Sequence, residues 1–96
     1  MLTRYVVSYD VREAKRLRRV FKRMRNYGDH LQYSVFDCLL SAKDLIRMKS
    51  DLAKEVDAAE DQVLIIKLGP ADSRAADAID SLGVKHEPPD RVVLVI

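Results

Sequence analysis

Apolar and polar positions change their period several times along the chain, and this pattern predicts alternating strands and helices. Residues 3–9 are β-branched and aromatic without a helical repeat, which is typical of a strand. Residues 31–40 are extended again, with alternation at their start. Residues 62–68 are a third strand that Gly69-Pro70 is expected to break, and residues 91–96 are a last strand.

Helical spacing fills the intervals between these strands. Residues 11–27 are predicted as a helix that Gly28 stops by adopting positive φ, and residues 42–56 as a second helix with Ser41 as N-cap. A short third helix is expected at residues 72–82. The inward stripe of the first helix is Ala14, Leu17, Val20, Phe21, Met24 and Tyr27. The stripes of the other two are Leu45, Met48, Leu52 and Val56, and then Ala75, Ala78, Ile79 and Leu82.

This order of elements predicts an α+β fold, a ferredoxin-like sandwich of βαββαβ type with both helices on one face of the sheet and an extra C-terminal strand. Residues 1–96 are expected to form this single domain. The fold requires two strands between the helices, but no Gly or Pro divides residues 31–40. These residues are either one long bent strand or two short strands, and the strand order stays open.

Composition narrows the class of protein. Of the 96 residues, 48% are apolar and 33% are charged, as in globular proteins. No apolar run approaches the roughly 20 residues of a membrane span, and no signal peptide is expected at the N-terminus. The single cysteine, Cys38, excludes an internal disulfide and indicates a reducing, cytoplasmic environment. Together with only two histidines, it also excludes a zinc finger within the chain.

The chain ends in five apolar residues, Val92, Val93, Leu94, Val95 and Ile96. A strand that is apolar on both faces needs a cover on both, and at an open edge it would promote aggregation. These residues either form an internal strand of their own sheet or pair with a second copy of the chain in a homodimer.

Charge is distributed unevenly. Residues 1–30 carry nine Lys and Arg against three acids, whereas residues 31–96 carry eight against twelve. The first helix concentrates the cations Arg12, Lys15, Arg16, Arg18, Arg19, Lys22, Arg23 and Arg25. Helix faces that are simply exposed to solvent usually carry both positive and negative side chains. Here only Glu13 opposes the cations, which favours contact with the phosphates of a nucleic acid over a merely solvated face. No aromatic residue interleaves with them on this helix, so base stacking is not indicated.

Asp10 stands where the first strand meets the basic helix, and it has two compatible interpretations. Asp10-Val11-Arg12-Glu13 fits an N-capping arrangement, in which Asp10 accepts backbone N–H bonds and Glu13 reaches back. Alternatively, Asp10 is a metal ligand. Two such carboxylates, one from each chain of a dimer, could hold Mg²⁺, which would activate water for phosphodiester hydrolysis.

Other candidates for chemistry are weaker. Ser34 has no His partner at a plausible position for a nucleophilic triad, and Cys38 is expected in the core. His30 and His86 are expected in loops, facing solvent.

Several segments together resemble the Cas2 family, the small CRISPR-associated proteins of spacer acquisition. Val6-Val7-Ser8-Tyr9-Asp10 ends the first strand, Lys15-Arg16 lies in the basic helix, and Tyr27-Gly28 follows it. Leu31-Gln32-Tyr33-Ser34-Val35-Phe36-Asp37-Cys38 and the acidic turn Glu60-Asp61-Gln62-Val63-Leu64-Ile65-Ile66 complete the resemblance. It covers residues 3–68.

The resemblance implies a ferredoxin-like homodimer whose C-terminal strand docks on the partner's sheet. It also implies a Mg²⁺-dependent endonuclease acting on single-stranded RNA or double-stranded DNA, with Asp10 as the catalytic metal ligand of each protomer. In spacer acquisition such a dimer bridges two dimers of the Cas1 integrase and holds DNA. The family usually has Glu where this chain has Asp37.

Three functions therefore compete: a metal-dependent endonuclease, a DNA-holding adaptor in which Asp10 only caps a helix, and a regulator that binds a small ligand. The unbalanced basic helix counts against the regulator. Family membership does not decide between the first two.

Overall fold

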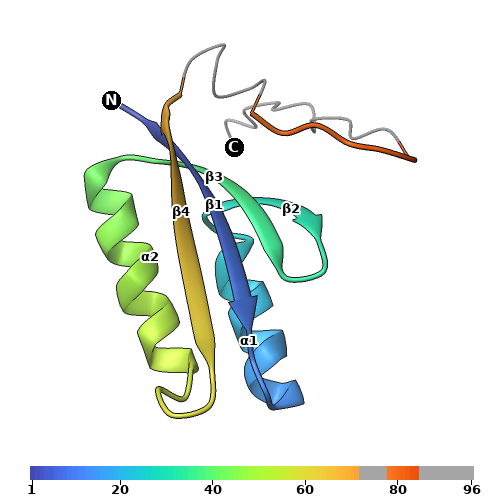
Figure 1. Cartoon of the computed structure of the whole chain (residues 1–96). Coiled ribbons are helices and arrows are strands. Elements are labelled where there is room, and N and C mark those ends of the chain that lie inside the picture. Colours follow the sequence, from blue (N-terminus) through green and yellow to red (C-terminus); the bar gives the residue numbers. More distant parts are fainter. Residues whose placement is uncertain (72–77, 85–96) are drawn as a thin grey trace, which may run out of the picture.

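The computed structural model describes residues 1–71 and 78–84, which contain six helices and strands in the order βαββαβ (Figure 1). They are β1 (Thr3–Asp10), α1 (Ala14–Met24), β2 (Gly28–Gln32), β3 (Val35–Leu40), α2 (Ala42–Glu55) and β4 (Gln62–Pro70). The strands form an antiparallel sheet in the order β2-β3-β1-β4, and both helices lie against one of its faces. The predicted α+β fold of ferredoxin-like type is confirmed.

Strand register decides which side chains face the helices. In β1 the buried residues are Tyr5, Val7 and Tyr9, and their partners across the β1–β3 ladder include Cys38 and Phe36. The two helices close this core with the fully or almost fully buried side chains Val20, Met24, Met48 and Leu52. The inward stripe predicted for α2 is confirmed, and that of α1 is confirmed at its centre, whereas Ala14 and Leu17 are exposed.

The other face of the sheet carries apolar residues with no described helix above them. Val6 stands beside Ile66 in the β1–β4 ladder, and Leu64 stands beside Ser8. Leu64 and Ile66 are about half exposed. We call Val6, Leu64 and Ile66 the apolar sheet face, and no described helix covers it.

Residues 31–40 are divided between two short strands, which settles the alternative that the sequence left open. β2 ends at Gln32, β3 begins at Val35, and the reversal is made without Gly or Pro. Tyr33 makes the turn with φ of 39°, a left-handed conformation that non-glycine residues seldom adopt. The sequence left both alternatives open because the usual residue signals of a turn are absent.

Gly28 does not stop the first helix, so that prediction is wrong. α1 already ends at Met24, and Gly28 begins β2 without positive φ. A Cβ at this position would lie 2.5 Å from both the carbonyl oxygen of Asp37 and the Sγ of Cys38. Glycine is therefore required by the close approach of β3.

The structure also differs from the predictions at the start of α1, at the end of β4 and at the third helix. α1 begins at Ala14, and β4 continues through Gly69 to Pro70, where the Ala71 N–H donates to the carbonyl of Leu2. Residues 78–82 form no helix, and Leu82 is exposed. The rest of the predicted third helix, and the predicted strand 91–96, lie outside the described residues. Within the described ranges, no helix is long and apolar enough to cross a membrane.

Candidate nucleic-acid interface

Helix α1 is capped by Glu13 and not by Asp10. The Glu13 carboxylate accepts hydrogen bonds from the backbone N–H groups of Lys15 and Arg16, at 2.9 and 2.8 Å. These bonds lower the pKa of Glu13. The capping interpretation of Asp10 is therefore wrong, because the helix starts too late for Asp10 to reach its first free N–H groups.

Asp10 instead ends β1 with its carboxylate directed into solvent. Its side chain is 69% exposed, and its nearest charged partner is Arg12, whose Nε lies 3.8 Å from Oδ2. A substitution at Asp10 therefore leaves the helix cap intact. Arg12 lies in the loop before α1, so it is not part of the helix on which it was predicted.

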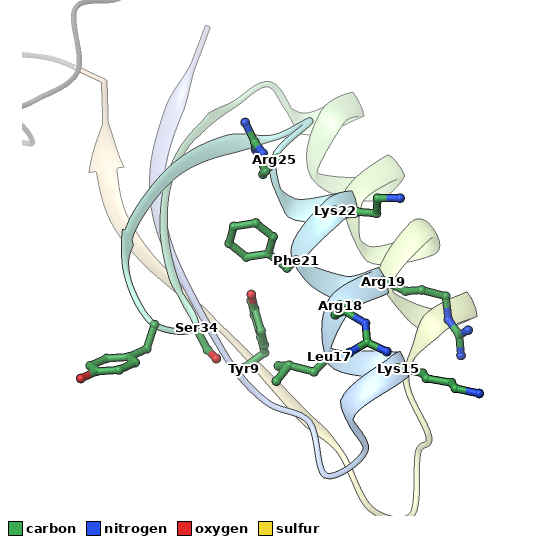
Figure 2. A pocket seen from close by; sticks show the side chains of 10 residues that line it. Tyr9, Lys15, Leu17, Arg18, Arg19, Phe21, Lys22, Arg25 and Ser34 are labelled. Atoms are coloured by element: carbon green, nitrogen blue, oxygen red, sulfur yellow. The ribbon is translucent and has the colours of Figure 1, made fainter.

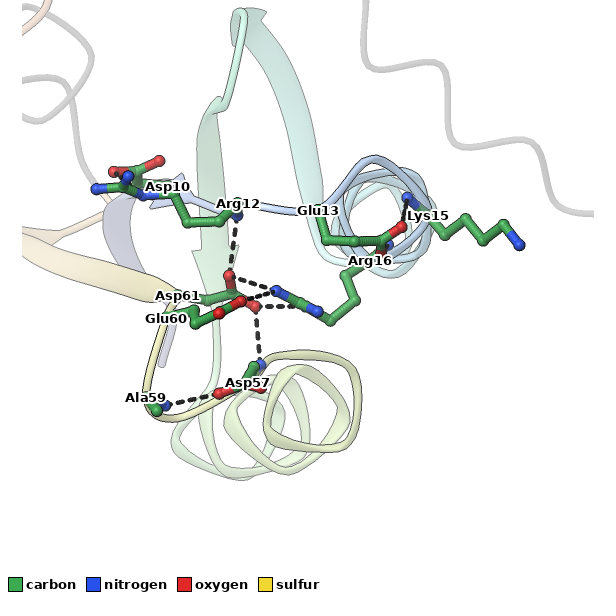
Figure 3. A network of polar contacts seen from close by, with 9 residues as sticks. All are labelled: Asp10, Arg12, Glu13, Lys15, Arg16, Asp57, Ala59, Glu60 and Asp61. Carbon is green, nitrogen blue, oxygen red and sulfur yellow. Dashed lines mark hydrogen bonds and ion pairs between the residues drawn. The ribbon is translucent and has the colours of Figure 1, made fainter.

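A buried carboxylate from a distant part of the chain holds this loop in place (Figure 3). Asp61, at the end of the acidic turn before β4, has a fully buried side chain. Its Oδ1 accepts the Arg12 N–H at 2.9 Å, and its Oδ2 accepts the Arg16 Nε–H at 2.8 Å and the Asp57 N–H at 2.8 Å. The bond from Arg16 is the main reason that the pKa of Asp61 is far below its usual range. Asp61 thus links the loop after Asp10, helix α1 and the turn after α2.

The structure divides the predicted phosphate-binding cations into two groups. Arg16 pairs with Asp61 and Glu60, and Arg19 and Arg23 pair with Glu55 of α2 at 3.1 and 3.4 Å. The exposed cations Lys15, Arg18, Lys22 and Arg25 form no ion pair with any described residue; we call them the free cations. The expectation that only Glu13 opposes the helix is wrong, because the opposing acids come from α2 and the turn after it.

A groove of about 800 Å³ lies between α1 and the turn that joins β2 to β3 (Figure 2). Apolar and aromatic side chains of Tyr9, Leu17 and Phe21 line it. So do all four free cations, as well as Arg19. Tyr33 and Ser34 contribute from the turn, and Tyr33 is 90% exposed. The expectation that no aromatic residue of the helix accompanies its cations is wrong, because Phe21 of α1 lines the groove beside them and lies under the Arg25 guanidinium, at 6.0 Å from Cζ to the ring centroid.

Among the described residues, His30 and Cys38 do not form a reactive centre. Cys38 is buried in the core, as predicted. His30 lies on strand β2 and not in a loop, although it is exposed as predicted; its Nε2 is 2.6 Å from the carbonyl of Tyr33, and its ring packs against Phe21 and Phe36. The Tyr9 backbone N–H donates to the Ser34 carbonyl at 3.1 Å, and burial raises the pKa of the Tyr9 hydroxyl. His86 lies outside the described residues.

The metal hypothesis for Asp10 has a definite geometric limit. Within the described part of the chain, no group of three or more His, Cys, Asp or Glu side chains could hold a metal ion. Asp61 already accepts four hydrogen bonds, Glu13 caps the helix and Glu60 pairs with Arg16, so Asp10 is the candidate metal ligand that the described part of one chain offers here. One or two carboxylates suffice for Mg²⁺ because this ion keeps most of its waters. Asp10 therefore fits as half of a site that a second chain would complete.

Fold and surface together define a small ferredoxin-like protein with a basic helix and an exposed aspartate at the end of its first strand. Comparison with known proteins identifies its family. A family model described as CRISPR associated protein Cas2 matches residues 1–75, and the chain belongs to this family, as the sequence resemblance indicated.

Individual relatives match almost the whole chain. The "CRISPR-associated endoribonuclease Cas2" of Geobacter sulfurreducens is 40% identical over 96% of this chain and 96% of its own length. The "CRISPR-associated endoribonuclease Cas2 1" of Rhodospirillum rubrum is 42% identical over 96% of this chain and 89% of its own. The crystal structure of Streptococcus pyogenes Cas2 at pH 6.5 superimposes with a TM-score of 0.72 and 27% identity, over 83% of this chain and 99% of that one.

Proposed function

We propose that this protein acts in CRISPR spacer acquisition as a homodimeric, Mg²⁺-dependent endonuclease of RNA or double-stranded DNA. The observation that carries the proposal is the placement of Asp10, an exposed carboxylate at the end of β1 beside the basic helix. The printed names of its relatives as endoribonucleases support nuclease chemistry.

In this proposal, each residue has a separate task. Asp10 of each protomer would hold Mg²⁺, which supplies an activated water and stabilises the charge that develops on the phosphodiester. The free cations would bind the phosphates on either side of the reacting one. Asp61 would keep the loop after Asp10 in a fixed relation to α1, because it binds the backbone of Arg12 and the side chain of Arg16.

Two features support a homodimer. The apolar sheet face formed by Val6, Leu64 and Ile66 is open to a second chain, and its burial would enlarge the core of a small domain. The strand predicted at residues 91–96 supplies a further segment for exchange. Removal of residues 91–96 should dissociate the dimer in sedimentation experiments; a truncated chain that forms the same dimer with equal stability would contradict the exchange.

The alternative is a DNA-holding adaptor that bridges Cas1 integrase dimers without catalysis. It is favoured by the four free cations, which suit sequence-independent phosphate contact. In this case Asp10 would not contribute to DNA binding.

Asp10→Asn separates the two functions, since Glu13 keeps the helix cap. Purified protein is assayed on single-stranded RNA and on duplex DNA with Mg²⁺ or EDTA, and duplex affinity is measured in parallel. Asp80→Asn, at an exposed acid outside the six helices and strands, is the matched control. The endonuclease proposal predicts cleavage that requires Mg²⁺ and is lost only in Asp10→Asn. Equal cleavage by both variants would overturn it, and duplex binding without cleavage by the unmodified protein would establish the adaptor.

A further inference from the structure

We propose that Arg12 binds the nucleic-acid phosphate nearest to Asp10, and that its ion pair with Asp10 competes with this contact. The Arg12 side chain would therefore pair either with the carboxylate of its own chain or with a phosphate. This inference rests on nucleic-acid binding as part of the proposed function, and it names the residue through which Asp10 and the nucleic acid influence each other.

Arg12 is the cation that the structure places beside Asp10 (Figure 3). Its side chain runs back along the loop toward Asp10, and its Nε lies 3.8 Å from Asp10 Oδ2. Lys15, on the first turn of α1, points away from Asp10 in the same view. Arg16 is held by two acids of the turn before β4. At this end of the helix, Arg12 is therefore the described cation that can reach a phosphate next to Asp10.

The ion pair between Arg12 and Asp10 is weak enough to be exchanged for another. Both side chains are 69% exposed, and 3.8 Å is well beyond the roughly 2.7–2.9 Å of a charge-assisted hydrogen bond. Exposed pairs of this kind contribute little in water. A phosphate, in contrast, offers two oxygens to the planar fork of a guanidinium. Arg12 would therefore leave Asp10 at little cost when a phosphate is within reach.

The backbone of Arg12 is fixed, although its side chain is exposed. Its N–H donates to Oδ1 of the buried Asp61 at 2.9 Å, and Asp61 is itself held by Arg16 and by the Asp57 N–H. The side chain therefore turns about an anchored point between two anions. When the Asp10 carboxylate is engaged by a divalent cation, Arg12 is released to the phosphate. Because such coupling is reciprocal, a bound phosphate would in turn remove a competing cation from Asp10.

A double-mutant cycle tests this competition. The unmodified protein, Asp10→Asn, Arg12→Gln and the double variant are titrated with a fluorescent DNA duplex, in EDTA so that cleavage plays no part. Because Asp10→Asn releases Arg12, it should tighten duplex binding roughly 1.5- to 5-fold more when Arg12 is present than in the Arg12→Gln background, the range of an exposed ion pair. The general effect of removing one negative charge is common to both backgrounds and cancels.

Salt dependence gives a second measurement from the same proteins. In the Asp10→Asn background, Arg12→Gln should reduce the magnitude of the slope of log K against log salt by about 0.9, because one phosphate contact with the duplex is lost. In the protein that keeps Asp10, the reduction should be smaller, since Arg12 is then shared with the carboxylate.

Three variants serve as matched controls. Arg12→Lys keeps the charge, so it should keep most of the slope. Glu60→Gln removes an exposed acid from the same end of the domain while Arg16 stays bound to Asp61, so its effect on affinity should not depend on Arg12. Lys54→Gln removes an exposed cation whose own ion pair, at 3.9 Å, is about as long, and it should leave the slope unchanged.

Additive effects of the two substitutions on affinity would refute the proposal, as would a slope that Arg12→Gln leaves unchanged in the Asp10→Asn background. A change of oligomeric state in Arg12→Gln on sedimentation would also refute it, because Arg12 would then belong to a contact between chains. Coupling in a protein that does not cleave with Mg²⁺ would support the role of Arg12 and reject the endonuclease. Mg²⁺-dependent cleavage that is lost in Asp10→Asn, together with additive affinities, would reject only the role of Arg12.

Discussion

Removing one partner of the ion pair between Arg4 and Asp37 should be among the most destabilising single substitutions in this domain. Arg4 of β1 donates to both carboxylate oxygens of Asp37 on β3, with Nε–Oδ1 at 2.8 Å and Nη2–Oδ2 at 2.5 Å. The side chains are only 12% and 6% exposed.

Arg4→Met removes the cation and keeps most of the side-chain volume, so it leaves the Asp37 carboxylate buried without this partner. Loss of one member of a buried pair costs about 3–5 kcal/mol. A domain of this size has about 5–15 kcal/mol of stability in total, and each kcal/mol shifts its melting temperature by about 4–8 °C. We expect a fall in melting temperature of at least about 12 °C.

The double variant Arg4→Met/Asp37→Leu identifies the cause. If the cost comes from the orphaned carboxylate, removing both charges should recover most of the lost stability, because apolar replacement of a buried pair is often neutral. Lys54→Met is the matched control: its pair with Asp51 is longer, at 3.9 Å, and Lys54 is exposed. This control should change stability by less than about 0.5 kcal/mol.

Urea unfolding of the unmodified protein and the three variants measures their free energies of unfolding. Equal m-values would show that the unfolded states are comparable. A loss below about 1 kcal/mol in Arg4→Met would refute the reasoning. So would a double variant as unstable as the single one, because the damage would then come from packing and not from an unpaired charge.

Three other substitutions test separate parts of the fold. Gly28→Ala should cost about 1–3 kcal/mol in thermal denaturation, since the new Cβ would meet the Asp37 carbonyl and the Cys38 sulfur; a loss below about 0.5 kcal/mol would contradict this packing. Ser41→Ala should cost about 1 kcal/mol by removing the hydrogen bond that the Asp44 N–H donates to Ser41 Oγ at 3.1 Å, and Ser41→Asp should largely preserve stability. The lowered pKa of Asp61 means that its ionised form stabilises the native state above about pH 4, and that this contribution is lost as the pH falls further. Asp61→Asn should therefore be less stable than the unmodified protein at pH 7, and this difference in stability should shrink as the pH falls toward 3. A difference in stability that does not depend on pH would reject the role assigned to the Asp61 carboxylate.

Capping residues and apolar periodicity predicted those elements whose boundaries depend on residues close in the sequence. α2 was placed within one residue at its C-terminal end, because Ser41 caps it and its apolar stripe is regular. The start of α1 was misplaced because Asp10 and Glu13 are both suitable N-caps. The choice between them involves the N–H of Arg12, which binds Asp61, 49 residues away in the sequence. The choice between one long strand and two short strands at residues 31–40 stayed open because Tyr33 adopts a turn conformation that its residue type does not suggest.

The sequence predicted which cations lie on the first helix, but it did not predict which of them form ion pairs within the domain. That division follows from helical geometry. Lys15, Arg18, Lys22 and Arg25 are spaced by three, four and three residues, so they lie on one stripe of α1. Arg16, Arg19 and Arg23 form a neighbouring stripe whose ion pairs are all with acids of α2 or the turn after it. The second stripe fixes α1 against the body of the domain, and the first stripe remains available for phosphates. The number of cations therefore exaggerates the binding surface. Of the seven from Lys15 to Arg25, three form the ion pairs above and Arg25 lies over the Phe21 ring, so among the described residues Lys15, Arg18 and Lys22 are the cations that can bind a ligand without breaking such a contact.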